Sequence, residues 1–523
     1  MTNRRAFLQS AAALAALPAV PGVAGAAGGA SVADVNEAER IARFDAGAAR
    51  DPRFLPLKGV SDATSALDAQ LKLTGRWPAD LRGRFYRNGP ALFERGGRRY
   101  HHWFDGDGMV QQFTFAGSGD APRVSHRGRL VATSKLARER QAGRFVVNAF
   151  GTGIAAPLDA PPQGPDTFNT ANTNAIEHAG RVLAMWEGGS AYALDPADLA
   201  TRGPVTWGEG LAQVPFSAHP KVDAQGHLWN IGTSGRTLVL WHIDPQGQLV
   251  SARPLPMPLA GAMVHDMAVT ARHIVVPIPP LTLHLSALSQ GGTLEQAMRF
   301  HADQPLRILV IDKNDVAQRR VFELPPQMVF HVGNAFERGD GRIELTYVGA
   351  DDAGFLTAGA AAMMLGEWSE VGDGGRSSIQ RVVLDMQSGR VQHDRFDDTV
   401  EFPRVDPRRV GEATRWLLTP ASWRNDRPAG FFHGLQLRDT ETGRVRRFDF
   451  GAHTVVEEHL LVPKRGASGE LQAWIIGTSF DARRRTSQLS VLDAERLEDG
   501  PVAQATLPYI LPYGFHGNFM AVG

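Results

Sequence analysis

One short pattern recurs along most of this chain and constrains its fold more than any other feature. A run of apolar residues ends in Asp, a few turn-forming residues follow, and a second strand-like segment begins. The pattern appears at six positions, separated by 49, 68, 73, 54 and 54 residues: Asp195, Asp244, Asp312, Asp385, Asp439 and Asp493. Apolar segments broken by such turns are typical of β-hairpins. The spacing approximates one four-stranded blade with loops of variable length, which predicts a β-propeller.

Composition favours one large β domain over a series of small ones. The chain has 56 Gly and 33 Pro among 523 residues, an excess that favours many tight turns. No Pro/Ser-rich or low-complexity linker interrupts the chain after its N-terminal region. We therefore expect residues 27–523 to form a single propeller domain, with one short helix at 34–49, where apolar residues recur at helical spacing.

The N-terminal residues have the features of an export signal. Two adjacent arginines, Arg4 and Arg5, precede an alanine-rich apolar run at 11–20, and small residues follow it. The run is shorter than the roughly 18 apolar residues that span a bilayer. We therefore expect residues 1–26 to be a cleaved twin-arginine signal peptide, which the twin-arginine export machinery would recognise to deliver the folded protein to the periplasm.

The charge and cysteine content exclude several classes of protein. The 55 Lys and Arg balance 55 Asp and Glu, so no basic excess argues for a nucleic-acid partner. The chain contains no Cys, which excludes a disulfide, a thiolate nucleophile, an iron–sulfur cluster and a Cys-ligated zinc. Any metal must therefore be held by His or oxygen ligands.

Four of the 17 histidines lie in apolar or Gly-rich strand contexts and are candidate metal ligands. They are separated by 46, 66 and 185 residues: His219, His265, His331 and His516. Because the inner strand of every propeller blade faces the same axis, residues one or several blades apart can converge there. Four neutral imidazoles suit a borderline divalent metal such as Fe, Zn or Cu. An octahedral Fe(II) would keep two positions open for dioxygen.

Acids embedded in apolar stretches are candidate partners for these imidazoles. A metal-bound His normally donates its other ring N–H to a carboxylate, and a buried acid is costly without a partner. Glu187, Glu401 and Glu458 fit this description. Glu457 is adjacent to Glu458 and fits as well, so the third position stays open between the two.

Together these segments resemble the carotenoid cleavage oxygenases, nonhaem iron enzymes that cut a carbon–carbon double bond with O2. The resemblance runs from about Leu71 onward, in family order, through GRFYRNGPALFE, HWFDGDGMVQQFTF, NTANTNAIEHAGRVLAMWEGG, SAHPKVD, HDMAVT, VFHVGNAFE, EFPRVDP and YGFHGNF. It implies an all-β, seven-bladed propeller with Fe(II) on its axis and a cap of loops and short helices. It also implies that the four histidines bind the iron and that Glu187, Glu401 and Glu458 orient them, with His516 lacking a glutamate partner.

The same resemblance implies a dioxygenase that takes O2 and a small hydrophobic alkene and yields two carbonyl products. The ANTN and WEGG segments look most like the branch that cleaves apocarotenoids, and cleavage of a phenolic stilbene or phenylpropene is the alternative. In the stilbene group a Lys and a Tyr hold the 4-hydroxyl group of the substrate, which Lys135 and Tyr100 could match; a solvated helix residue is the alternative for Lys135. A non-catalytic binding propeller and a zinc-dependent hydrolase are further alternatives.

Three local predictions complete this interpretation. Phe216, Phe336 and Phe515 lie near candidate ligands and are candidates for the lining of an apolar substrate tunnel, with ordinary core packing as the alternative. The Asp-Gly-Asp-Gly run at 105–108 is expected to be a tight hairpin turn and not a metal loop. The Pro-rich segment 277–288 argues against a central strand; related enzymes have an apolar entrance here that can touch membrane, so it is a candidate peripheral membrane contact, with a packed loop as the alternative.

Overall fold

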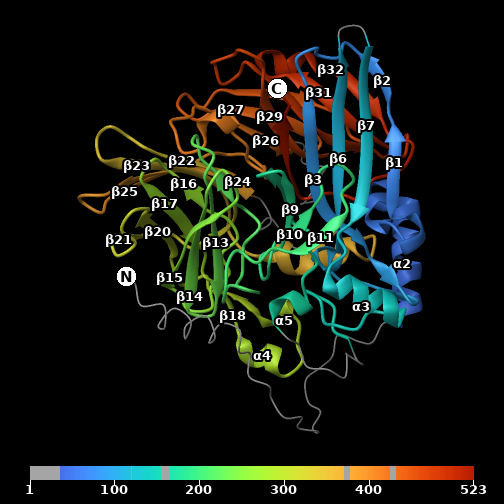
Figure 1. Ribbon diagram of the computed structural model, residues 1–523, viewed down its shortest axis with the longest axis horizontal. Helices are drawn as coiled ribbons and strands as arrows, with labels where there is room; N and C mark the ends of the chain where they lie inside the picture. Colours follow the sequence, from blue (N-terminus) through green and yellow to red (C-terminus); the bar gives the residue numbers. More distant parts are fainter. Residues whose placement is uncertain (1–35, 119–120, 155–163, 370–376, 424–430, 523) are drawn as a thin grey trace.

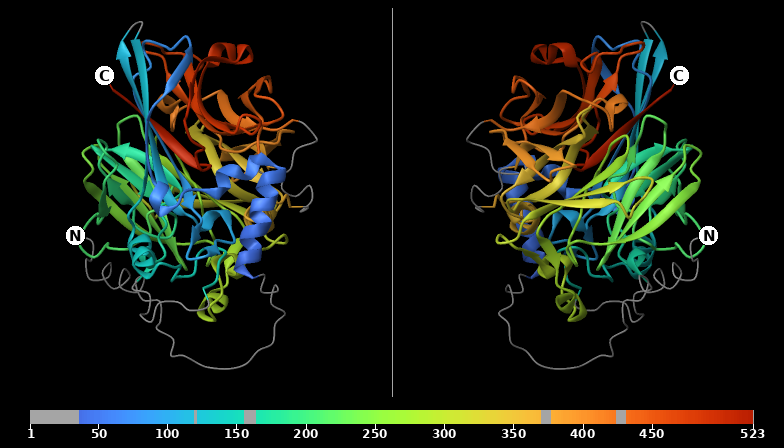
Figure 2. Two further views of the ribbon diagram at one scale, coloured as in Figure 1. Left: turned by 90° about the vertical axis from the view of Figure 1, so that its right-hand side faces the viewer. Right: turned by 90° about the vertical axis from the view of Figure 1, so that its left-hand side faces the viewer.

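The computed structural model describes residues 36–118, 121–154, 164–369, 377–423 and 431–522, and the signal peptide predicted for residues 1–26 lies outside these ranges. Seven antiparallel sheets of three to five strands follow one another around a common axis (Figures 1 and 2). The predicted seven-bladed β-propeller is therefore confirmed.

The first four blades, each given from its inner to its outer strand, contain most of the candidate site. Blade 1 consists of β33 (His516–Ala521), β3 (Gly83–Leu92), β6 (Asp107–Ser118), β7 (Ala121–Leu130) and β1 (Ala66–Gln70). Blade 2 consists of β8 (Asn174–His178), β9 (Arg181–Met185), β10 (Tyr192–Leu194) and β11 (Thr201–Pro204). Blade 3 consists of β12 (Lys221–Val222), β13 (Leu228–Ser234), β14 (Thr237–Ile243) and β15 (Leu249–Pro256). Blade 4 consists of β16 (Ala268–Val269), β17 (His273–Ile278), β20 (Leu306–Asp312) and β21 (Arg319–Leu324).

Three further blades complete the ring. Blade 5 consists of β22 (Met328–Glu337), β23 (Arg342–Ala350), β24 (Ser377–Asp385) and β25 (Val391–Arg395). Blade 6 consists of β26 (Trp416–Ala421), β27 (Gly434–Asp439) and β28 (Val445–Asp449). Blade 7 consists of β29 (Thr454–Pro463), β30 (Ala473–Asp481), β31 (Thr486–Asp493), β32 (Pro501–Thr506) and β2 (Lys72–Gly75). Two short ribbons, β4 (Glu94–Arg95) with β5 (Arg98–Arg99) and β18 (Leu281–Leu283) with β19 (Met298–Phe300), lie outside the blades.

The ring is closed by strands from opposite parts of the chain. β33 pairs with β3, with His516 opposite Asn88, and β2 pairs with β32, with Lys72 opposite Thr506. Each of these strands completes a blade that is otherwise built from the other part of the sequence. Closure therefore rests on backbone hydrogen bonds, and it leaves no long unpaired edge between the first and last blades.

The six Asp residues of the sequence repeat lie at the turns that join the last two consecutive strands of blades 2 to 7. The Asp244 carboxylate accepts hydrogen bonds from the backbone N–H groups of Gln246 and Gln248. The Asp385 carboxylate does the same for Gln387 and Ser388. An Asp side chain that binds backbone N–H groups two to four residues further on stabilises a turn, so the pattern recurs because each blade needs this hairpin.

Short helices and loops cover one face of the propeller, the lower side in Figures 1 and 2. The helices are α2 (Glu37–Arg50), α3 (Ser134–Ala142), α4 (Leu285–Ser289), α5 (Leu294–Ala297) and α6 (Ala360–Met363), with the short elements η1 (Pro52–Lys58), η3 (Trp103–Asp105) and η5 (Phe355–Gly359). The helix expected at 34–49 is confirmed as α2; its Gly47 lies so close to Gly366 that an added Cβ would approach Gly366 O to 2.2 Å. Among the described residues, no helix is long and apolar enough to cross a membrane.

The hairpin turn predicted at 105–108 is wrong in detail. Residues up to Asp105 form the turn of η3, and Asp107 already begins β6. Asp105 is fully buried, and its carboxylate accepts hydrogen bonds from Gly151 N at 2.8 Å and Thr152 Oγ1 at 2.6 Å. The run therefore anchors the cap to blade 1, and a structural role for it is correct.

The expectation that Pro277 lies outside a central strand is also wrong. Pro277 is part of β17, which lies between β16 and β20. It is tolerated because β16 pairs with β17 only at Ile274 and Val275. Beyond these two residues one edge of β17 is unpaired within blade 4, so the missing N–H of proline removes no bond to β16 there.

Buried histidines outside the axis are expected to make stability depend on pH. His126 in β7 has its ring nitrogens 2.7 Å from Tyr509 Oη and 2.8 Å from Gln111 Oε1, and burial lowers the pKa of His126 from 6.5 to about 3. Between these values the unfolded chain takes up a proton that the folded protein does not, so the free energy of unfolding falls as pH falls, by up to about 1.4 kcal/mol per pH unit. Urea unfolding of metal-free protein across this window should show a shallower pH slope for His126→Gln; an unchanged slope would contradict the assignment.

Candidate metal centre

Four imidazoles meet on the propeller axis. Their ligand atoms all lie within 4.8 Å of one another, and all four side chains are buried: His219, His265, His331 and His516. Each lies within or just before the inner strand of a blade, namely β12, β16, β22 and β33. The structure thus brings together the four histidines that the sequence singled out, and it does so because inner strands face a common axis.

Three of these imidazoles have a glutamate beside the Nδ1 atom. The pairs are His265 with Glu187 Oε1 at 3.0 Å, His331 with Glu401, and His516 with Glu458 Oε1 at 2.9 Å. The expectation that His516 lacks a glutamate partner is therefore wrong. The histidine without one is His219, whose nearest carboxylate oxygen is Asp266 Oδ2, 4.0 Å from its Nδ1.

Glu458, and not Glu457, occupies the third glutamate position. Glu457 points away from the axis, where it binds Arg87 and accepts hydrogen bonds from Thr478 Oγ1 at 2.7 Å and Gly514 N at 2.7 Å. β29 pairs irregularly with β30 between Val456 and His459, so these contacts, and not strand alternation, show that Glu458 is the acid that reaches His516.

The donor set fits a divalent metal ion. Where the Nδ1–H group donates to a glutamate, the Nε2 atom carries a lone pair. The Nε2 atoms of His219 and His265 are 2.9 Å apart, and those of His265 and His331 are 3.2 Å apart. Lone pairs at these distances repel each other unless a cation lies between them. A metal about 2.1 Å from each of two nitrogen ligands at a right angle places them about 3 Å apart.

The electrostatics favour the neutral form, which binds metal, for two of these imidazoles, His219 and His516. Burial lowers the pKa of His219 well below its usual value, and the other three imidazoles lower it further. Burial also lowers the pKa of His516, to about 4, against the opposing effect of Glu458. For His331, burial alone would lower the pKa, but the charge and hydrogen bond of Glu401, together with the charges of Asp266 and Glu458, outweigh burial and raise it.

An unusual backbone conformation places the partner of His331. Phe402 has a φ of 54°, which side-chain-bearing residues rarely adopt and which carries strain. Its N–H donates to Glu401 Oε2 at 2.5 Å, and its ring lies against His331 and His516, with centroid distances of 5.1 and 5.2 Å. The turn therefore directs Glu401 to one imidazole and covers two of them with an aromatic ring.

An apolar cavity of about 150 Å³ reaches the cluster from the capped face, where it contacts His265, His331 and His516. Its walls are mainly aromatic and aliphatic and include Phe104, Phe150, Met263, Phe330, Phe355 and Phe515. Two of these come from cap elements, because Phe104 belongs to η3 and Phe355 to η5. Such a wall suits an apolar ligand.

Only one of the three phenylalanines expected in the tunnel lies there. Phe515 lines the cavity. Phe216 is instead fully buried in the propeller core, with its ring 5.0 Å from Trp207 and 5.5 Å from Trp241. Phe336 lies in β22 opposite Glu344 and is also absent from the cavity wall.

Lys135 and Tyr100 do meet, but away from the cavity wall. Lys135 lies in α3 and is fully buried. Its Nζ donates to Tyr100 Oη at 2.7 Å, Asp107 Oδ1 at 2.9 Å and Glu139 Oε2 at 3.0 Å. An ammonium group has three donors, so these acceptors satisfy it, and neither Lys135 nor Tyr100 lines the cavity. The expected substrate anchor is thus part of a buried ion network.

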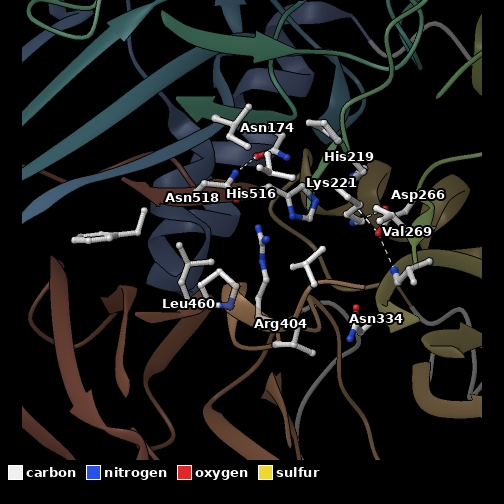
Figure 3. A pocket seen from close by; sticks show the side chains of 18 of the residues that line it. Asn174, His219, Lys221, Asp266, Val269, Asn334, Arg404, Leu460, His516 and Asn518 are labelled. Carbon is white, nitrogen blue, oxygen red and sulfur yellow. Dashed lines mark hydrogen bonds and ion pairs between the residues drawn. The ribbon is translucent and has the colours of Figure 1, made fainter. Parts of the chain in front are cut away.

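A second, polar cavity lies on the other side of the cluster and was not predicted from the sequence. It has a volume of about 510 Å³ and is lined by His219, His331 and His516 (Figure 3). Arg404 projects into it, with its Nε 2.8 Å from Glu458 Oε1. Together with His516, Arg404 holds the pKa of Glu458 at about 2, although burial alone would raise it. The only sequence signal for Arg404 was its place three residues after Glu401.

Comparisons with known proteins agree with this arrangement. The family described as retinal pigment epithelial membrane protein matches residues 60–521. The chain is 30% identical over 469 residues to the apocarotenoid-15,15'-oxygenase of Synechocystis sp., covering 85% of this chain and 91% of that one. It is also 30% identical over 477 residues to lignostilbene-alpha,beta-dioxygenase isozyme III of Sphingomonas paucimobilis, covering 86% and 93%.

A solved structure supports the same relationship. The structure of cobalt-substituted Synechocystis apocarotenoid oxygenase is similar, with a TM-score of 0.78 and 27% sequence identity, and the match covers 90% of this chain and 99% of that one. The sequence match spans most of the propeller, and the four-histidine cluster lies on its axis. This chain therefore belongs to the retinal pigment epithelial membrane protein family, the carotenoid cleavage oxygenases, and is an oxygenase.

Proposed function

We propose that this chain is a nonhaem iron(II) dioxygenase that cleaves a conjugated carbon–carbon double bond of an apocarotenoid. The observation that carries the proposal is the cluster of four imidazoles at the inner end of an aromatic cavity. Among divalent metals that accept imidazole, iron(II) combines this donor set with open positions and O2 chemistry. His219, His265, His331 and His516 would hold it.

The substrate class follows from the cavity and from the relatives. The aromatic and aliphatic wall offers stacking surfaces along a conjugated chain and few polar contacts. One similar protein is named for cleaving an apocarotenoid and another for a lignostilbene. The buried and fully paired Lys135 favours the first of these, because it offers no free donor to a phenolic hydroxyl.

The residues of this chain bind, orient and shield the reactants. Phe104, Phe330 and Phe515 exclude water and hold the alkene beside the cluster, while the glutamates fix the imidazole rings. Bound iron(II) supplies open coordination positions and the electron density that activates O2. In the overall reaction the C=C bond breaks and each carbon takes one oxygen atom of O2, so the balance needs no external reductant.

Metal analysis and O2 uptake test the proposal directly. We expect one iron per chain, and O2 consumption equal to the 8'-apocarotenol consumed, with two carbonyl products. A hydroxystilbene assayed in parallel should be the poorer substrate. Zinc-supported turnover without O2 uptake would indicate a hydrolase instead, and protein that binds no stoichiometric metal would indicate a binding propeller.

Lys135 separates the apocarotenoid proposal from its stilbene alternative. We expect Lys135→Met to destabilise the fold by about 3–5 kcal/mol, because it leaves Asp107 and Glu139 buried without their cation. The KM values for 8'-apocarotenol and for a hydroxystilbene should both stay unchanged. Steady-state kinetics and urea unfolding measure these effects. A KM that rises more than about tenfold for the hydroxystilbene alone would show that Lys135 holds the phenol.

Export and membrane contact are further parts of the proposal. The twin-arginine pathway carries folded proteins, which suits a protein that acquires its metal before it reaches the periplasm. A peripheral membrane contact through 277–288 stays a prediction, and Leu281 does not take part in it because it is only 1% exposed. Leu283 and Leu288 are half-buried, so the contact is tested by comparing liposome flotation of the Leu283→Asp/Leu288→Asp variant with that of wild type. Equal flotation of the two proteins would contradict a membrane contact through this segment.

A further inference from the structure

The four-histidine cluster lies between two cavities, one of which has a more polar wall than the other. His331 and His516 line both cavities, whereas His219 lines only the polar one and His265 only the apolar one. The polar cavity, here called the axial channel, has more than three times the volume of the apolar cavity, at about 510 against 150 Å³. The apolar cavity accounts for the binding of an apolar substrate, so the axial channel needs a different explanation.

We propose that the axial channel is the route by which a hydrated divalent metal ion enters and leaves the cluster, separate from the route of the substrate. This inference rests on the proposed metal centre but not on the identity of the substrate. Moving a divalent ion through an apolar passage is costly, because its hydration shell is lost without replacement. The ion therefore requires a path that offers oxygen ligands or room for water.

The wall of the axial channel meets this requirement. Four carboxylates line it, those of Glu177, Asp223, Asp266 and Glu458, together with the side-chain amides of Asn174, Asn334 and Asn518. Figure 3 labels Asp266 and the three amides. Oxygen groups are the ligands that replace water around hard divalent cations. The described wall of the apolar cavity offers fewer such groups: three carboxylates, those of Glu187, Asp352 and Glu401, and the side-chain amide of Asn172.

The two cations of the channel do not oppose entry. Lys221 Nζ lies 2.7 Å from Asp266 Oδ1, and Arg404 Nε lies 2.8 Å from Glu458 Oε1. Each positive charge is therefore neutralised by a carboxylate of the same wall. Glu177 is paired with Arg84, so the Asp223 carboxylate supplies the remaining negative charge, which favours a cation in the channel.

The channel also opens to solvent. Its wall includes the exposed residues Ala179 and Pro407, from the β8–β9 turn and from the segment before β26. In contrast, each residue on the described wall of the apolar cavity is buried or half-buried. A hydrated ion can thus pass from the surface to three of the four imidazoles without crossing the aromatic wall.

The experiment narrows each cavity separately and measures how fast metal binds. Val222→Trp and Val410→Trp each place a large side chain in the axial channel, at half-buried positions that are not ligands of the cluster. Ala350→Trp is the matched control in the apolar cavity. Protein stripped with a chelator is mixed with Co(II), and the tryptophan fluorescence or cobalt absorbance is followed in a stopped-flow instrument; release is followed after addition of chelator.

We expect each channel variant to slow both association and release of Co(II) by about tenfold or more, with an unchanged equilibrium dissociation constant, because a narrowed path alters the barrier in both directions. Ala350→Trp should bind metal at the wild-type rate and lose turnover of 8'-apocarotenol. Thermal unfolding identifies a variant that does not fold. If one channel variant fails to fold, the metal-binding rates of the other test the proposed route. Channel variants that load at the wild-type rate, or slow loading in Ala350→Trp, would overturn the route. A wrong substrate assignment would instead appear as lost turnover in wild type with loading kinetics as expected.

Discussion

His331→Ala protein is expected to purify without stoichiometric iron and to lose at least about a thousandfold in turnover, since metal activation contributes several kcal/mol to such a reaction. The loss has two causes. One of four donors disappears from a cluster whose ligand atoms lie within 4.8 Å of one another, and the Glu401 carboxylate is left without the imidazole that it binds. Metal analysis of the purified protein and O2 uptake measure the two effects.

His126→Ala is the matched control for this substitution. His126 is also a buried histidine, but it lies between Tyr509 and Gln111 in blade 1 and away from the axis. This variant should lose stability and keep its iron. If His331→Ala retained both iron and turnover, the imidazole cluster would have no role as a metal centre.

The adjacent acids Glu457 and Glu458 should respond to substitution in different ways. Glu458→Gln is expected to weaken metal binding by about 10- to 100-fold, because a glutamate that orients a metal-bound imidazole typically contributes that much. Glu457→Gln should leave metal affinity unchanged and lower the free energy of unfolding by about 3–5 kcal/mol, because Arg87 is then a buried charge without its partner.

Co(II) titration and urea unfolding of both variants separate these outcomes. Each variant serves as the control for the other, since the two residues are neighbours in β29 and the chemical change is identical. Equal effects of the two substitutions on metal affinity would mean that the hydrogen bond from His516 to Glu458 does not orient the ligand.

The blades and the positions of the four histidines could be predicted because the structure repeats. In a closed ring of similar blades, the spacing of residues along the sequence determines which blade each residue belongs to. Each Asp of the repeat stabilises a hairpin through its own turn, as Asp244 does, so the blade period appears directly in the sequence. Because the inner strand of every blade faces the propeller axis, a histidine in or beside an inner strand lies near that axis whichever blade it comes from. His219 and His516 therefore meet although almost 300 residues separate them along the chain.

The residues around the cluster could not be predicted in the same way. β22 contains irregular pairing on both sides of Val332. The alternation of side chains along a regular strand therefore does not predict whether Phe336 points to the same side as His331. The sequence neighbours of Lys135 do not show that its side chain is buried. Its environment is formed by residues distant in the sequence, Asp107 of β6 and Tyr100 of the cap. The partner of His516 depended on which of two neighbouring acids faces inward, and that choice is made by the register of β29.

The closure of the ring has a consequence for biosynthesis. β33 carries His516 and is the last of the described strands, yet it is the innermost strand of blade 1. During translation the other six blades emerge first, and until β33 docks against β3 the nascent protein holds three imidazoles in an unfinished ring. The pairing of β33 with β3 therefore closes the ring and completes the metal centre in one step. A polypeptide that ends before β33 would lack both the fourth imidazole and the strand that completes blade 1.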